Sequence, residues 1–175
     1  MQAGAFPYPN CWLSLLICVF ALYISGHSAH AQDLSAEITK HQERYVNLQK
    51  EITTSQARIL SSANTYGAQE VAYGQLDYVG DMLSSMNREF DVLSITMGLA
   101  SMVTDKRLVP FSRQYIDVQR SYMTKQTSIS VKSIEKIMPR VTDQETIRLL
   151  LEARDILRSS SDFLDRLKSV EAQRK

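Results

Sequence analysis

The side chain best suited to chemistry in this chain is His41. Residues 32–175 contain no other histidine and no cysteine. A lone imidazole beside a thioether could bind Cu(I), because soft sulfur ligands suit that ion. Counting turns along an antiparallel neighbour places Met97 near the level of His41. A core histidine hydrogen-bonded to a hydroxyl, such as that of Tyr115, is the simpler interpretation, since methionines at helical spacing usually fill irregular cores. The sequence therefore predicts no metal site and no cofactor.

Other groups that could support catalysis are few. Asp77 and Asp81 are spaced for acid–base work, but they lie on a helical stretch rich in other acids, which favours a solvated face or one facing a basic helix. The Glu-x-x-His motif of di-iron bundles is absent, and so is a phosphate-binding loop. A hydrolytic triad would have only His41 as its base. We therefore expect a protein that is not an enzyme and has no catalytic residues; an enzyme of unrecognised type is the third interpretation.

Tyrosines are the more suggestive residues. Tyr66, Tyr73 and Tyr78 gather with glycines around the expected first turn between helices. A tyrosine offers a large apolar face and a hydroxyl, which suits a partner surface. If consecutive helices run antiparallel, Arg140 lies at the same end. The sequence predicts partner binding by these four residues; in the alternative, Tyr73 and Tyr78 only close the end of the bundle.

The N-terminal 31 residues differ from the rest. They carry no Lys, Arg, Asp or Glu, and an apolar block at residues 12–25 precedes Ala29-His30-Ala31. An apolar stretch followed by an A-x-A site is typical of a secretory signal peptide, and the block is shorter than the roughly 20 residues of a membrane span. The predicted organisation is a signal peptide over 1–31 and a single domain over 32–175. Because no basic residue precedes the block, a retained N-terminal anchor is the alternative.

Hydrophobic residues after residue 33 recur at the 3-4 spacing of amphipathic helices. Helices are expected over residues 34–63, 68–104 and 112–138, with a loop at 105–110, and a fourth helix follows a capping box at Thr142–Glu145. The predicted core stripes are Ile38, His41, Tyr45, Leu48, Ile52, Ser55, Ile59 and Ser62; Val79, Met82, Met86, Phe90, Leu93, Met97 and Ala100; Phe111, Tyr115, Val118, Tyr122, Ile129, Ile134 and Ile137; and Leu149, Ala153, Ile156, Ser160, Phe163, Leu167 and Val170, widened by Leu150, Leu157 and Leu164.

Four helices with short connections predict an all-α, up-down-up-down four-helix bundle. Residues 68–105 carry an excess of acids and residues 112–140 an excess of bases. Antiparallel neighbours of opposite charge attract, although each exposed pair contributes only tenths of a kcal/mol. The alternative is a long coiled-coil hairpin that dimerises.

Composition and organisation together indicate a function class. The formal net charge of +1 gives no support to nucleic-acid binding. We expect a soluble, periplasmic or secreted protein, without a membrane span once the signal is cleaved. It would bind another envelope or secreted protein as an adaptor, a scaffold or an accessory subunit of a secretion system or pilus, or form a homodimer. A carrier that holds a small ligand or Cu(I) in the bundle interior is the alternative.

Overall fold

The computed structural model describes the backbone of residues 10–61 and 67–172, and the side chains of residues 33–61, 67 and 69–167. These residues form helices and no β-strand. The helices are α1 (Asn10–Ser61), α2 (Ala68–Ser101), α3 (Val109–Ile137), the short 3-10 helix η1 (Met138–Arg140) and α4 (Gln144–Ala172). The chain divides into two compact units, Met1–Glu37 and Ile38–Lys175. In the first unit the backbone is helical from Asn10 onward.

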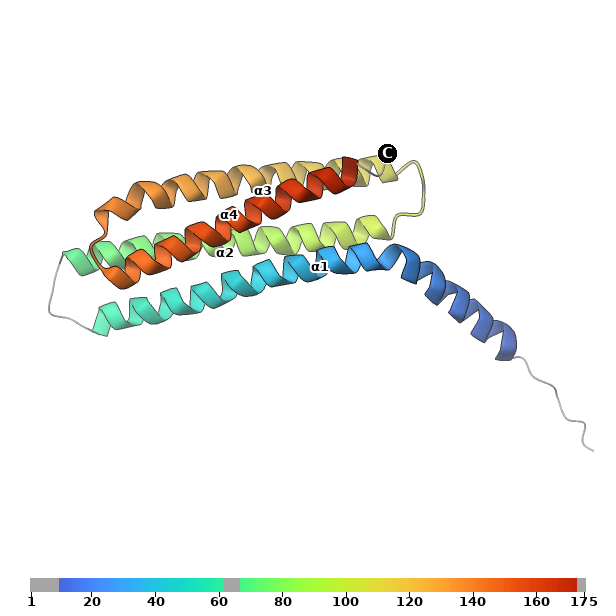
Figure 1. Ribbon diagram of the computed structural model, residues 1–175, viewed down its shortest axis with the longest axis horizontal. Helices are drawn as coiled ribbons and strands as arrows, with labels where there is room; N and C mark the ends of the chain where they lie inside the picture. The colour runs from blue at the N-terminus through green and yellow to red at the C-terminus, as the bar shows by residue number, and fades with distance from the viewer. Residues whose placement is uncertain (1–9, 62–66, 173–175) are drawn as a thin grey trace, which may run out of the picture. The chain divides into compact units, whose positions relative to one another are not determined.

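The second unit is an up-down-up-down four-helix bundle, as predicted (Figure 1). From residue 38 onward, α1 lies beside α2 and α4. The Gln49 side chain donates to the Gly80 carbonyl oxygen of α2 at 3.3 Å, and Arg148 of α4 pairs with Glu51 at 2.8 Å. Packing of α3 against α2 and α4 completes the bundle. The coiled-coil hairpin alternative is therefore wrong for the single chain.

The core stripes predicted for α1, α2 and α4 are confirmed except at Ile59 and Met82, which are half-buried; Ser62 and Val170 lie outside the described side chains. On α4 every predicted position with a described side chain is buried, as it is on α1 from Ile38 to Ser55. On α2 the stripe also includes Ala72, Leu76 and Leu83, and it becomes half-buried towards Ala100. Burying one such large apolar side chain contributes roughly 1.5–3 kcal/mol, so these three stripes carry most of the apolar stabilisation.

The stripe predicted for α3 is wrong over most of its length. Its first five members, Phe111, Tyr115, Val118, Tyr122 and Ile129, are exposed. The residues that α3 buries are Ile116, Arg120, Met123, Thr127, Ser130 and Ile134.

Two stripes at the same spacing therefore compete on α3, and the less apolar one faces inward. Its polar side chains are satisfied locally, which lowers the cost of burying them. The Thr127 hydroxyl lies 3.0 Å from the Met123 carbonyl oxygen and 2.8 Å from that of Thr124. The Arg120 guanidinium donates to Asp117 at 3.2 Å. The bundle thus forms without burying the outer stripe of α3.

Helix starts also differ from prediction in three places. Because Pro110 lacks an amide hydrogen that a first turn would leave unbonded anyway, α3 begins at Val109 and contains it. The cap of α4 is Asp143, not Thr142: its carboxylate accepts the Thr146 backbone amide at 2.7 Å and the Thr146 hydroxyl at 2.6 Å. Helix α1 begins at Asn10 rather than near residue 34.

Candidate functional site

The His41 imidazole lies in an aromatic cluster inside the bundle. Its ring stacks on Phe90 of α2, with centroids 5.6 Å apart and an interplanar angle of 3°, and lies 5.2 Å from the ring of Phe163 of α4. Its Nδ1 is 3.1 Å from the Ser160 Oγ. The hydroxyl partner is therefore Ser160 and not Tyr115, whose side chain is exposed.

The electrostatics of this cluster keep the imidazole neutral. Burial, helped by the positive charges of Arg44, Arg166 and Lys40, lowers the pKa of His41 to about 4. Burial also raises the pKa of Tyr45, whose hydroxyl donates to Ser160 Oγ at 2.9 Å. No described group of three or more His, Cys, Asp or Glu side chains is placed to hold a metal ion. The cluster is thus a packed, hydrogen-bonded part of the core.

The predicted tyrosine site is only partly described. Tyr66 lies outside the described residues. Tyr73 is half-buried in the second turn of α2, Tyr78 is exposed further along that helix, and Arg140 is exposed in η1. The start of α2 and the end of α3 do lie at one end of the bundle (Figure 1). Among described side chains, no hydrogen bond or ring contact joins Tyr73, Tyr78 and Arg140, so a shared binding role stays a prediction.

An exposed apolar surface lies elsewhere in the described part of the chain, along the outer sides of α2 and α3. Ten side chains, each between 41% and 75% exposed, make up what we call the α2–α3 apolar face. Its members are Val92, Ile95, Leu99, Met102, Leu108, Phe111, Tyr115, Val118, Tyr122 and Ile129. On each helix they follow the 3-4 spacing that places residues on one side.

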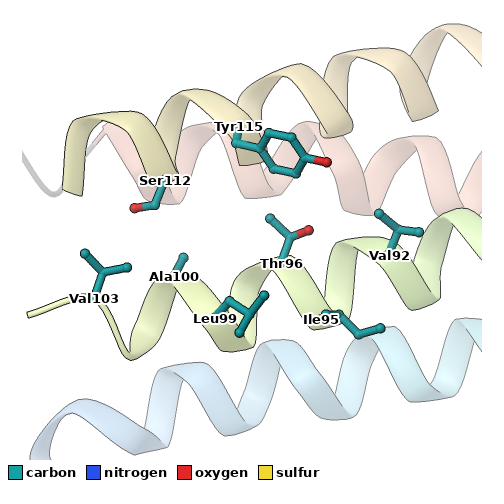
Figure 2. A pocket seen from close by; sticks show the side chains of 8 residues that line it. All are labelled: Val92, Ile95, Thr96, Leu99, Ala100, Val103, Ser112 and Tyr115. Atoms are coloured by element: carbon teal, nitrogen blue, oxygen red, sulfur yellow. The ribbon is translucent and has the colours of Figure 1, made fainter. Parts of the chain in front are cut away.

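An open groove of about 490 Å³ runs between α2 and α3 within this face. In Figure 2 the Tyr115 ring projects from α3 towards Thr96 of α2, and Ser112 lies above Ala100. The remaining lining is mostly aliphatic, supplied by Val92, Ile95, Leu99 and Val103. Such a surface offers apolar contact and few hydrogen bonds, which suits recognition of another apolar surface rather than bond-making chemistry.

Charged side chains also lie along the same two helices, partly within the span of the apolar face. Exposed acids on α2 include Glu70, Asp77 and Asp81, and exposed bases on α3 include Lys125, Lys132 and Lys136. Exposed charges of the other sign are Arg88 on α2 and Asp117 and Glu135 on α3. No ion pair joins α2 to α3 among the described residues; their side chains are joined by a hydrogen bond from Gln119 to Glu89 at 2.6 Å. The two helices are neighbours, as predicted, but pairing of their opposite charges is not what holds them together.

The sequence indicates the outer stripe of α3, but not whether this stripe faces the core or the solvent. Its aromatic and aliphatic residues predict a helical face, and periodicity alone cannot tell a face that meets the core from one that meets a partner. Among the residues whose side chains the structure describes, no helical stretch is long and apolar enough to cross a membrane. Comparisons with known proteins gave no match to a family model, a curated protein or a solved structure.

Proposed function

We propose that this protein is an exported, non-enzymatic helical bundle that works by binding protein through the α2–α3 apolar face. The observation that carries the proposal is the exposure of that face: a helix with apolar residues on both sides is normally covered on both. Contiguous exposed apolar patches above a few hundred Å² mark interaction sites on soluble proteins. Five of the ten members lie on α3, and three of these five are aromatic, which makes α3 the centre of the surface.

The setting proposed for this function is the periplasm or the extracellular space. It is supported by the uncharged, apolar N-terminal 31 residues with their A-x-A site, which are typical of a secretory signal. A protein of this kind acts as an adaptor, a scaffold or an accessory subunit of a secretion system or pilus, and its partner is an envelope or secreted protein. The tyrosine end, with Tyr73 and Arg140, is a second candidate contact surface.

A carrier function is the alternative that one observation favours. The groove between α2 and α3 has the volume of a small-ligand site and an apolar lining. A carrier would use this surface groove, since the bundle interior near His41 is filled by Phe90 and Phe163. Native mass spectrometry of the purified protein separates the two: a carrier retains a small molecule, whereas a protein-binding bundle gives the mass of protein alone.

The test is photo-cross-linking in cells that export the chain. A photoreactive amino acid replaces Leu99 or Val118 on the α2–α3 apolar face, and matched controls carry it at Asn47 on α1 or Asp162 on α4, which are also exposed. The proposal predicts protein adducts at Leu99 and Val118 and few at the controls. Equal labelling at all four positions, or none at Leu99 and Val118, refutes the proposed surface. The same probe at Tyr73 tests the second candidate surface.

A further inference from the structure

We infer that the α2–α3 apolar face binds a second copy of this chain, forming a two-fold dimer in which α2 of each copy packs on α3 of the other. The inference rests on the proposed function, because it names the partner of the surface proposed there. Its basis is that both the apolar and the charged parts of the surface are complementary to themselves. A two-fold interface requires such self-complementarity, since each contact between residue i and residue j occurs twice.

The levels of residues along the two helices follow from one contact. Gln119 of α3 bonds Glu89 of α2, and the helices are antiparallel, so positions further along α3 lie level with positions equally far back along α2. Counting from this bond places Lys125 level with Asp81, Lys132 with Asp77 and Lys136 with Glu70, each to within about one turn. The apolar residues of α2 after Val92 lie level with those of α3 up to Tyr115, as the shared groove shows (Figure 2).

The two-fold axis lies parallel to the helices, in the interface above the groove between α2 and α3. Rotation about it leaves the position of each residue along the helix axis unchanged. Rotation about this axis lays α2 of one copy over α3 of the other without sliding either along its length. The apolar residues of α2 from Val92 to Met102 then meet the partner's α3 from Leu108 to Val118, whereas Tyr122 and Ile129 lie level with the charged part of α2. Farther along, Asp81 meets the partner's Lys125. Asp77, whose carboxylate also accepts a hydrogen bond from Gln56 of α1 at 3.3 Å, lies level with the partner's Lys132. The apolar half supplies affinity, and the charged half fixes the register.

The area available is sufficient for a stable dimer. Ten side chains exposed by 41–75% offer apolar contact on each copy. At about 100 Å² per side chain this amounts to roughly 1,000 Å² per copy, against the roughly 800 Å² that each partner contributes to a standard protein interface. In the dimer α3 would be covered on both of its apolar sides, which accounts for the presence of two stripes on one helix.

The experiment is sedimentation equilibrium of the chain purified with a C-terminal tag after expression of the full-length sequence. We expect a dimer at micromolar concentration. The double variant Leu99→Glu, Val118→Glu should raise the dimer dissociation constant at least a hundredfold, because four charges enter an apolar interface. Its helix content by circular dichroism should be unchanged, since both side chains are exposed in the single chain.

Charge reversal tests the register and the identity of the partner. Asp81→Lys and Lys125→Asp should each weaken the dimer about three- to tenfold, since each change affects two symmetric exposed pairs. The combined variant should regain most of the affinity, and the matched control Asp162→Lys on α4 should have no effect. A dimer that is insensitive to the Leu99, Val118 double variant, or reversals that do not rescue one another, overturns the inference.

If the purified protein is a monomer, the cross-linking results distinguish a failure of the inferred dimer from a failure of the proposed function. A monomer at about 100 µM whose Leu99 and Val118 probes still capture a different protein in cells overturns the dimer and leaves the proposed surface standing. A monomer that floats with anionic phospholipid vesicles, with no protein adduct at these probes, assigns the face to lipid and overturns both. A monomer whose probes capture nothing also overturns both.

Discussion

Replacing His41 by glutamine isolates the contribution of one buried imidazole to stability. His41 is 5% exposed, and its pKa is lowered from 6.5 to about 4, mainly by burial and further by the positive charges of Arg44, Arg166 and Lys40. In the unfolded chain the imidazole takes up its proton near pH 6.5, whereas the folded chain resists protonation until about pH 4. The unfolded state therefore binds more protons between these values, and acid shifts the equilibrium towards it.

The sign and size of the effect follow from these two pKa values. The folded state keeps its full stability above pH 6.5 and loses the contribution of His41 progressively as the pH falls to 4. Each pKa unit corresponds to 1.36 kcal/mol, so the whole loss is about 3 kcal/mol. Glutamine can still hydrogen-bond to Ser160 and takes up no proton, so the His41→Gln variant should lack this part of the acid destabilisation.

The assay is urea unfolding at pH values from 7 to 4, followed by circular dichroism, for wild type and His41→Gln. Carboxylates titrate in both proteins and cancel in the difference between their unfolding free energies. We expect that difference to change by about 3 kcal/mol in favour of the variant from pH 7 to pH 4. A difference that stays constant, or an imidazole that titrates near pH 6.5 by NMR in the folded protein, would refute the buried, neutral assignment of His41.

Three further substitutions test the packing by urea unfolding. Asp143→Ala removes the cap of α4 and should cost about 1 kcal/mol, whereas Asp162→Ala within the same helix should cost little. Met123→Ser on the inner side of α3 should cost roughly 2–5 kcal/mol, while Val118→Ser on the outer side should cost under about 0.5 kcal/mol in the dilute monomer. If Val118→Ser cost more than Met123→Ser, the buried side of α3 would be the stripe that periodicity predicts. Tyr45→Phe should cost about 1 kcal/mol through loss of its bond to Ser160.

The fold could be predicted from the sequence because α1 and α4 carry only one strongly apolar stripe each. On α4 the stripe from Leu149 to Leu167 leaves a single choice of inner face, and the same is true of α1 from Ile38 to Ser55. Pro139 ends α3 near its predicted end. Where one face alone can be buried, hydrophobic periodicity determines both the helix and its orientation.

There is a physical reason why the orientation of α3 could not be predicted from the sequence. Its outer stripe is richer in aromatic residues than its inner one, so hydrophobicity favours the wrong face. The inner stripe can be buried because Thr127 and Arg120 form hydrogen bonds within their own helix. Hydrophobic periodicity does not include this contribution. The pairing of His41 with Ser160 likewise depends on which helices are adjacent. Because periodicity assigns the residues of the outer stripe to the core, it gives no indication that they form an exposed surface.

The most direct test of the central proposal is the solvent exposure of four methyl-bearing side chains in the purified protein. A soluble paramagnetic agent broadens the NMR signals of exposed methyl groups. In the single chain Leu99, Val118, Leu60 and Val46 are all exposed. At protein concentrations above the dimer dissociation constant, we predict that Leu99 and Val118 are protected while Leu60 and Val46 on α1 are broadened. Equal broadening of all four would show that the α2–α3 apolar face stays open to water in the purified protein, and would contradict the inferred dimer.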